Sequence, residues 1–212
     1  MTAAPGKIVC VGRNYADHAA ELGNEVPAEP LIFLKPPSAV IAAGEPIRVP
    51  PDAGRVDYEG EIGLVMGRRC RRVSEAEAWS HVGGVVAVND VTARDLQEKD
   101  DQWTRAKGLD SFCPVGNVVD AAAVQPDELA LTTRVNGEVK QQAEVAGMVF
   151  SLGHLVSFIS HVMTLEAGDL IATGTPEGVG PVSPGDVVEV ALSCGSEVRN
   201  SVEGGEMLAP AG

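Results

Sequence analysis

Short apolar runs separated by turn residues dominate the chain and predict β-strands. The runs are rich in Val, Ile and Leu, which suit the half-buried surface of a sheet, and each is bounded by Gly, Pro, Asn or Asp. The expected strands cover residues 7–11, 31–34, 61–66, 85–88, 129–135, 170–172 and 187–192. The pattern therefore predicts a mainly β protein with few short helices, in the α+β class.

Two turn signals lie beside expected strands. Asn136-Gly137 and Pro184-Gly185-Asp186 contain residues that tolerate the dihedral angles of a tight turn. The strands that flank each turn are therefore expected to be antiparallel neighbours.

Helical stretches are few. We expect helices at residues 15–22, at 74–82 with Ser74 as the N-cap, and at 151–163, where apolar residues recur three and four positions apart.

The chain shows no clear domain boundary. Residues 36–56, rich in Pro, Ala and Gly, are expected to form an extended connection rather than a linker between domains. We therefore expect one domain over 1–212, with an amino-terminal lobe at about 1–50 and a β core at about 51–212.

Composition limits the classes of partner. The chain has 212 residues, 44% of them hydrophobic, which is enough for one good core. Its net charge of −14 repels a phosphate backbone or an anionic membrane over a Debye length of about 8 Å. No apolar run approaches the roughly 20 residues that span a bilayer. We therefore expect no nucleic-acid partner and no membrane partner.

The cysteines indicate the compartment. All four are dispersed and form no CxxC pair, which argues against a zinc knuckle or a redox dithiol. With no export signal visible, reduced thiols in a cytoplasmic protein are the preferred interpretation.

Three carboxylates are candidate metal ligands. Glu59 and Glu61 lie at i and i+2 of one expected strand, so their side chains share a face, although a solvated face is the more common arrangement for such a pair. Asp90 follows an apolar strand and must be solvated, paired with a cation such as Arg94, or bound to metal, because a lone buried carboxylate is very costly. Three such oxygen donors suit Mg2+ or Mn2+.

A histidine and a glutamate form a candidate dyad. His18 and Glu21 lie at i and i+3 of the first expected helix, so they share a helix face. The carboxylate would raise the basicity of the imidazole, which could then take a proton from water. A solvated surface pair is the alternative.

Two further segments could contact an anion. Lys107 is the one cation of a loop-like stretch, and it either neutralises a substrate carboxylate or is simply solvated. Residues 173–180 combine two hydroxyls with several glycines, a composition suited to holding an anion or to linking two strands.

Taken in order, seven motifs resemble the fumarylacetoacetate hydrolase family over residues 7 to 203. They are GRNYADHAAELG, LIFLKPPSAV, DYEGEIGLVMG, NDVTARDLQ, WTRAKGLDSFCPVG, VNGEV and GDLIATGTPEGVGPV. The chain is most similar to the compact branch that contains acylpyruvate hydrolases, oxaloacetate decarboxylases and isomerase-decarboxylases of aromatic catabolism. The resemblance implies a mixed β-roll or sandwich, a homodimer, and one Mg2+ or Mn2+ per chain.

The resemblance also implies roles for individual residues. The metal ligands would be Glu59, Glu61 and Asp90. The catalytic dyad, carried on a lid, would be His18 and Glu21. The substrate-binding residues would be Arg13, Asn14, Gln97, Lys107 and Thr175, with Arg94 bracing the site.

These roles imply metal-dependent cleavage of a carbon–carbon bond in a small 2-oxo acid through a metal-stabilised enolate. Hydrolysis of an acylpyruvate, such as fumarylpyruvate or acetylpyruvate, is the expected reaction. The alternatives are oxaloacetate decarboxylation, isomerisation and decarboxylation of a 2-oxo or 2-hydroxy dienedioate, and a metal-stabilised dimer that only binds 2-oxo acids.

Overall fold

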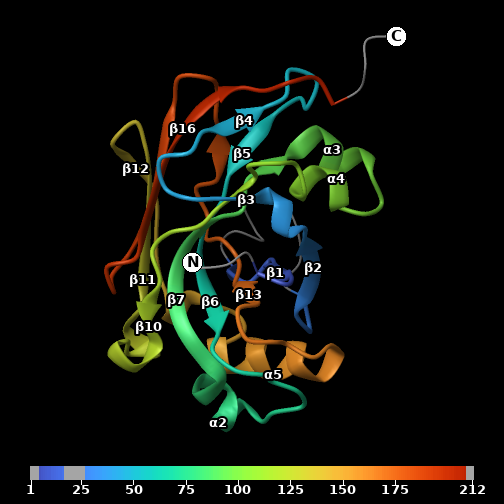
Figure 1. Ribbon diagram of the computed structural model, residues 1–212. Helices are drawn as coiled ribbons and strands as arrows, with labels where there is room; N and C mark the ends of the chain where they lie inside the picture. The colour runs from blue at the N-terminus through green and yellow to red at the C-terminus, as the bar shows by residue number, and fades with distance from the viewer. Residues whose placement is uncertain (1–4, 17–26, 209–212) are drawn as a thin grey trace.

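The computed structural model describes residues 5–16 and 27–208 of the chain. Strands predominate and helices are few and short, which confirms the expected mainly β class (Figure 1). The described helices are α2 (Glu75–Ala78), α3 (Arg94–Lys99), α4 (Thr104–Lys107) and α5 (Leu152–Val162). Short 3-10 turns are η1 (Pro37–Ala39), η2 (Trp79–His81), η3 (Ala121–Ala123), η4 (Pro126–Glu128) and η5 (Val145–Gly147). Within the described residues, no helix has the length and apolar character needed to cross a bilayer.

The largest sheet has six strands and joins segments from both ends of the chain. In spatial order they are β10 (Val119–Asp120), β7 (Val82–Asn89), β6 (Gly60–Met66), β13 (Leu170–Ala172), β1 (Ile8–Gly12) and β2 (Leu31–Lys35). Strands β1 and β13 run parallel, and the other neighbours run antiparallel. Because β13 pairs with both β1 and β6, the amino-terminal strands share a sheet with the candidate metal ligand Glu61.

A second sheet of five strands faces the first. In spatial order its strands are β12 (Glu138–Glu144), β11 (Ala130–Val135), β15 (Val187–Leu192), β16 (Glu197–Gly204) and β4 (Ile47–Val49). Two small sheets complete the fold. One contains β14 (Gly180–Pro181), β5 (Val56–Tyr58) and β8 (Thr92–Ala93), and the other contains β3 (Val40–Ile41) and β9 (Cys113–Pro114).

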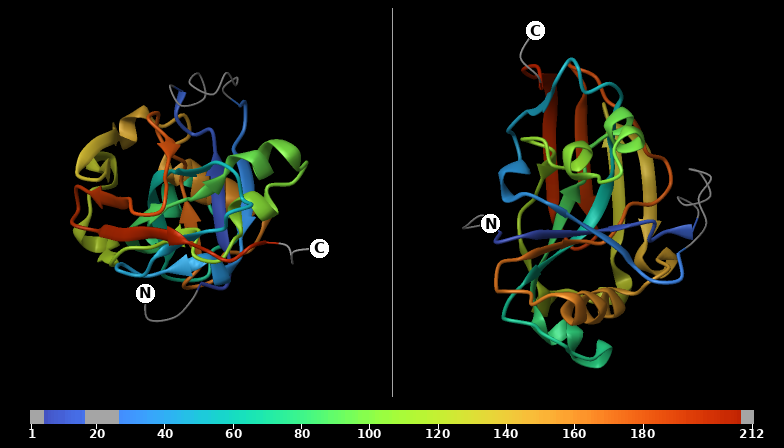
Figure 2. Two further views of the ribbon diagram at one scale, coloured as in Figure 1. Left: turned by 90° about the horizontal axis from the view of Figure 1, so that it is seen from above. Right: turned by 90° about the vertical axis from the view of Figure 1, so that its right-hand side faces the viewer.

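The main apolar core lies between the two large sheets and helix α5. Ile62 of β6, Leu131 of β11 and Ile159 of α5 belong to it, and each is fully buried. Ser151 caps α5 by accepting a hydrogen bond from the His154 amide, as the expected helix requires. Helices α5 and α2 lie together at one end of the molecule, whereas α3 and α4 lie on the other side of β1 and β2 (Figures 1 and 2).

One of the two expected turns joins a hairpin. Asn136 and Gly137 have φ angles of 53° and 84° and link the antiparallel strands β11 and β12, as predicted. The turn at Pro184-Gly185 is formed, but the expected pairing is wrong because β14 and β15, which flank it, belong to different sheets.

Two other expectations need correction. The expected connection at 36–56 contains the short strands β3 and β4, which pair with segments far along the chain. The helix expected at 74–82 begins after Ser74 as predicted, and the Glu77 side chain accepts a hydrogen bond from the Ser74 amide, but Val82 already belongs to β7. The helix expected at 15–22 lies almost entirely outside the described residues.

Candidate active site

The candidate site forms where the backbone passes from one sheet to another. Glu59 is the single residue between β5 and β6, which belong to different sheets. The expectation that Glu59 and Glu61 share one strand is therefore wrong. Hydrogen bonds from a side chain and from the backbone fix the position of the Glu59 backbone. The Glu59 amide donates to Asn89 Oδ1 at 3.0 Å, and the Asp90 amide donates to the Glu59 carbonyl at 2.7 Å. These bonds bring Glu59 and Asp90 next to each other.

Three buried carboxylates converge at this point. One oxygen from each of Glu59, Glu61 and Asp90 lies within 4.8 Å of the others. The three residues are 5%, 1% and 1% exposed. The solvated face considered for the two glutamates is therefore wrong, and the carboxylates must be balanced by cations.

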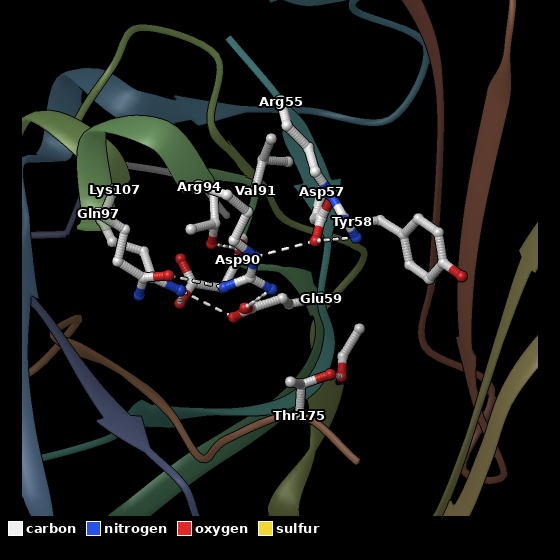
Figure 3. A network of polar contacts seen from close by, with 12 residues as sticks. Arg55, Asp57, Tyr58, Glu59, Asp90, Val91, Arg94, Gln97, Lys107 and Thr175 are labelled. Carbon is white, nitrogen blue, oxygen red and sulfur yellow. Dashed lines mark hydrogen bonds and ion pairs between the residues drawn. The ribbon is translucent and has the colours of Figure 1, made fainter. Parts of the chain in front are cut away.

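Three cations among the described residues contact this triad, and Figure 3 shows two of them, Arg94 and Lys107. Lys107 Nζ lies 2.7 Å from both Glu59 Oε2 and Asp90 Oδ2, and Lys35 Nζ lies 2.6 Å from Asp90 Oδ1. Arg94 Nη2 lies 2.5 Å from Glu59 Oε1. Lys107 is only 2% exposed, so the solvated alternative for this lysine is wrong.

Arg94 connects the triad to its surroundings. Its guanidinium contacts Glu59, donates to Asp57 Oδ2 at 2.9 Å, and donates to Gln97 Oε1 at 2.8 Å. The expected alternative of an Arg94–Asp90 pair is not formed, because Asp90 is paired with the two lysines. Arg94 therefore holds Gln97 by its carbonyl oxygen, and the Gln97 amide nitrogen donates no hydrogen bond to another described residue.

Burial and neighbouring carboxylates shift the pKa values of Glu61 and Lys107. Burial, and then the neighbouring Asp90 and Glu59, raise the pKa of Glu61 well above its usual range. Burial alone would lower the pKa of Lys107, but Asp90 and Glu59 outweigh it, so the net pKa is raised above that of an ordinary lysine. Lys107 is therefore a permanent cation at neutral pH.

The triad fits a divalent metal ion. Glu61 makes no ion pair with any described lysine or arginine, and its Oε2 accepts a hydrogen bond from the Gly174 amide at 2.8 Å. A small, hard cation beside Glu61 would offset both the burial and the carboxylate repulsion that raise its pKa, and three carboxylate oxygens are the donors that Mg2+ and Mn2+ prefer.

The Thr175 hydroxyl is already committed to the protein. It donates to the Gly60 carbonyl at 2.9 Å and accepts from Gln141 Nε2 at 2.8 Å. The other end of Gln141 accepts from the Gly60 amide at 3.0 Å. Both hydrogen bonds hold the Thr175 hydroxyl at the cavity wall, and the substrate contact expected for Thr175 stays a prediction.

A small cavity of about 210 Å³ opens beside the triad. Drug-sized ligand pockets occupy about 300–1,000 Å³, so this cavity suits a small metabolite. Phe33 and Trp103 form an apolar wall, with ring centroids 5.2 Å apart in an edge-to-face contact. The polar residues that line it are Arg13, Glu59, Glu61, Asp90, Arg94, Gln97, Lys107 and Thr175.

The structure brings most of the expected site residues together. Of the expected substrate contacts, Arg13 lines the cavity, whereas Asn14 does not. The Asn14 side chain instead clamps two loops, donating to the Thr173 carbonyl at 2.8 Å and accepting from the Phe150 amide at 2.8 Å. The dyad of His18 and Glu21 lies outside the described residues.

Two residues of the site have no signal in the single sequence. Lys35 ends an ordinary apolar strand, and Gln141 lies in the polar segment EVKQQAE, where nothing marks one glutamine as buried. Both act through tertiary contacts that only the folded chain creates.

The family model for the C-terminal domain of fumarylacetoacetate (FAA) hydrolase matches residues 7–203. The chain therefore belongs to the fumarylacetoacetate hydrolase family. It is 45% identical over 201 residues to the mitochondrial oxaloacetate tautomerase FAHD1 of Pongo abelii, covering 92% of this chain and 91% of that protein. The corresponding tautomerase of Arabidopsis thaliana is 46% identical, with 93% and 91% covered.

Solved structures of related isomerases share the fold. The 5-carboxymethyl-2-hydroxymuconate delta-isomerase of Mycobacterium smegmatis is 44% identical with a TM-score of 0.88, covering 94% of this chain and 79% of that one. The 2-hydroxyhepta-2,4-diene-1,7-dioate isomerase of Mycobacterium marinum is 46% identical with a TM-score of 0.87, covering 94% and 75%. The relatives named here are enzymes that act on oxo or hydroxy acids.

Proposed function

We propose that this chain is a divalent-metal-dependent enzyme that interconverts the keto and enol forms of a small 2-oxo acid, with oxaloacetate as the substrate. The observation that carries the proposal is the convergence of three buried carboxylates and a buried lysine in one small cavity. Similarity to the two tautomerases supports the choice of oxaloacetate. This chain covers 91% of the length of each tautomerase, but 79% and 75% of the lengths of the two isomerases.

Glu59, Glu61 and Asp90 would hold Mg2+ or Mn2+. A bound ion would act as a Lewis acid that polarises the 2-oxo group and stabilises negative charge on its oxygen.

Lys107 serves as a hydrogen-bond donor to the substrate. An ammonium group has three N–H donors, and Glu59 and Asp90 accept two of them. The third is available for a substrate oxygen. Glu59 and Asp90 raise the pKa of Lys107, which favours its protonated form as a donor, so we assign the removal of the C3 proton to another group.

The proton at C3 therefore needs another acceptor. Among the described residues that line the cavity, the carboxylates belong to the metal-binding triad and the remaining charged groups are cations. We propose His18, oriented by Glu21, as this base. The matching test is His18→Ala, for which catalysed tautomerisation is expected to fall about 100-fold. An unchanged rate would remove His18 from the mechanism.

The proposed reaction is tested by mixing the enol form of oxaloacetate with the protein and following the loss of enol absorbance. The samples contain Mg2+, Mn2+ or a chelator, and pyruvate is assayed in parallel. We expect metal-dependent loss of enol with little pyruvate. An enol decay equal to that of buffer in every sample would overturn the proposal.

Acylpyruvate hydrolysis, the reaction that the sequence alone favours, is the second candidate. It uses the same enolate-stabilising site and adds an activated water, for which the pairing of His18 with Glu21 in the sequence is the favouring feature. Stoichiometric pyruvate release from acetylpyruvate or fumarylpyruvate, at a catalytic efficiency above that of oxaloacetate tautomerisation, would place this candidate first. Pyruvate release from oxaloacetate would instead indicate decarboxylation.

A further inference from the structure

Each nitrogen of the Arg94 guanidinium contacts a different acceptor. Nε donates to Asp57 Oδ2 at 2.9 Å, Nη1 donates to Gln97 Oε1 at 2.8 Å, and Nη2 lies 2.5 Å from Glu59 Oε1 (Figure 3). Glu59 and Gln97 line the cavity, whereas Asp57 does not. One planar group therefore fixes a candidate metal ligand relative to a second cavity residue, and its third acceptor lies outside the cavity.

Asp57 is itself held in place. It is 1% exposed and lies on β5, which pairs it with Thr92 of β8 and with Pro181 of β14. Arg55 Nε donates to Asp57 Oδ1 at 2.7 Å, and Arg55 Nη2 donates to Asp57 Oδ2 at 3.1 Å. The Arg55 carbonyl also accepts from the Arg94 amide at 2.7 Å, so the segment that leads into β5 anchors the beginning of α3. The Asp57 carboxylate therefore offers Arg94 a fixed acceptor.

The contact between Arg94 and Glu59 uses only part of what an arginine offers a carboxylate. Nε and Nη2 lie on one edge of the guanidinium, and this edge commonly binds both oxygens of a single carboxylate. Here Asp57 accepts from Nε and Glu59 contacts Nη2. Glu59 meets Arg94 through Oε1, while its Oε2 lies 2.7 Å from Lys107 Nζ. Without Asp57, Nε would lack its acceptor, and bidentate pairing would draw Glu59 toward Arg94 and away from the triad.

We propose that Asp57 is a positioning residue that acts through Arg94. By accepting from Nε, it keeps the guanidinium from pairing with both oxygens of Glu59, and so holds Glu59 in the orientation that binds the divalent ion. This role rests on the proposed function, which makes Glu59 a metal ligand. Removing a hydrogen-bond partner behind the ligands of a metal site typically costs about 10- to 100-fold in metal affinity. Because Asp57 is two contacts away from the ion, we expect the smaller loss.

Mn2+ affinity tests this role without turnover. The electron paramagnetic resonance signal of free Mn2+ is followed as the ion is titrated into chelator-stripped protein. Asp57→Ala should weaken binding about 10-fold. Asp57→Asn loses the same charge but keeps an acceptor for Arg94 Nε, so its affinity should lie nearer to wild type than to Asp57→Ala. Equal losses in the two variants would overturn the proposal, because only the charge of Asp57 would then matter.

A double-mutant cycle shows whether Asp57 acts through Arg94. In an Arg94→Gln background, Asp57→Ala should change Mn2+ affinity by about 2-fold or less, since the group through which Asp57 acts is gone. A further loss of about 10-fold in that background would contradict the connection through Arg94 and overturn the proposal.

Asp100→Ala is the matched control. Asp100 accepts two hydrogen bonds from the Arg105 guanidinium, at 2.7 and 2.6 Å, and does not line the cavity. This variant also removes a carboxylate from an arginine, and it should keep the wild-type Mn2+ affinity. If thermal denaturation shows that Asp57→Ala does not fold, Asp57→Glu replaces it, because it keeps the charge but displaces the carboxylate by one methylene. Asp57→Glu should bind Mn2+ more weakly than Asp57→Asn, and the reverse order would overturn the proposal.

The role of Asp57 and the proposed function fail in different ways. If wild type binds Mn2+ and ketonises oxaloacetate but Asp57→Ala keeps the wild-type affinity, the role of Asp57 is refuted and the proposed function stands. If wild type binds Mn2+ without turnover, the proposed reaction is refuted, and the affinities of the variants still decide the role of Asp57. A wild-type protein that binds no Mn2+ would overturn both.

Discussion

Asp90 divides its two carboxylate oxygens between two buried lysines, Lys35 and Lys107. Lys35 does not line the cavity, and it also donates to the Val91 carbonyl at 3.2 Å. It therefore fixes the Asp90 carboxylate without contacting the cavity. This arrangement sets which Asp90 oxygen faces the triad. Lys35 is thus a positioning residue, since it acts through Asp90.

Lys35→Met tests this role. Breaking a buried ion pair leaves an uncompensated charge, and the expected loss in the free energy of unfolding is about 3 kcal/mol. Thermal denaturation measures the loss, and calorimetric Mg2+ titration should show weaker binding. Lys140→Met, the same change in the exposed Lys140–Glu138 pair, is the control and should change little. A normal Mg2+ affinity in Lys35→Met would contradict the positioning role.

Glu61 makes the stability of the metal-free protein depend on pH. Its pKa is raised in the folded state, so the folded protein holds this proton more tightly than the unfolded chain. The stabilising contribution is therefore complete below the ordinary glutamate pKa of about 4.3 and is lost as pH rises through the folded value.

The comparison of wild type with Glu61→Gln isolates this contribution. In a chelator, the wild-type melting temperature relative to that of Glu61→Gln should fall as pH rises from about 4.3 toward neutrality. Saturating Mg2+, which favours the charged carboxylate, should oppose the trend. Glu197→Gln, an exposed glutamate of β16, serves as the control. A difference in melting temperature between wild type and Glu61→Gln that stays constant with pH would show that Glu61 does not titrate in this way.

Among single residues, the sequence predicts the convergence of Glu59, Glu61 and Asp90 but gives the wrong reason for it. Alternation along one strand would bring the two glutamates to one face, whereas Glu59 lies where the chain changes sheets. Lys35 could not be predicted, because its function depends on the pairing of β2 with β1, far from Asp90 in the sequence.

At the scale of elements, β12 supports the site from the second sheet. Gln141 accepts a hydrogen bond from the Gly60 amide and donates to Thr175 Oγ1 and to the Pro176 carbonyl. These contacts tie the start of β6 to the loop that follows β13. The geometry of the cavity wall therefore depends on a strand that contributes no residue to its lining.

Gln141→Leu is expected to destabilise the protein and reduce turnover. The change leaves the buried Gly60 amide and Pro176 carbonyl without partners, at a cost of about 1–3 kcal/mol for each group. Denaturant unfolding and the enol assay measure the two effects. The neighbouring Gln142 is exposed, so Gln142→Leu is the control. Wild-type stability in Gln141→Leu would refute the supporting role of β12.

The apolar pattern predicts the continuously apolar, buried strands and misses the polar strands and several of the shortest ones. Strands β1, β6, β7 and β13 are almost continuously buried, and each overlaps an expected strand. The strands β12 and β16 carry mostly polar side chains, and β5, β8 and β9 have two or three residues. Such segments become strands through their pairing partners, which lie far away in the sequence.

At the scale of the whole molecule, we propose that the chain forms a homodimer, as the family resemblance implies. The chain has a mass of 22.0 kDa, and light scattering after size exclusion should give twice this value. The dimer mass should stay the same on dilution and after metal chelation if the dimer interface is independent of the metal site. A monomeric mass under all conditions would contradict the proposal.

The central claim is that the buried triad binds a divalent ion and uses it for enol chemistry. The most direct test is the rate of oxaloacetate ketonisation by chelator-stripped protein as Mg2+ or Mn2+ is added back, in wild type and Glu61→Gln. We expect a low rate without metal, a rise that saturates at one ion per chain, and little rise in Glu61→Gln. Full activity in the stripped protein, or an equal response in Glu61→Gln, would contradict the claim.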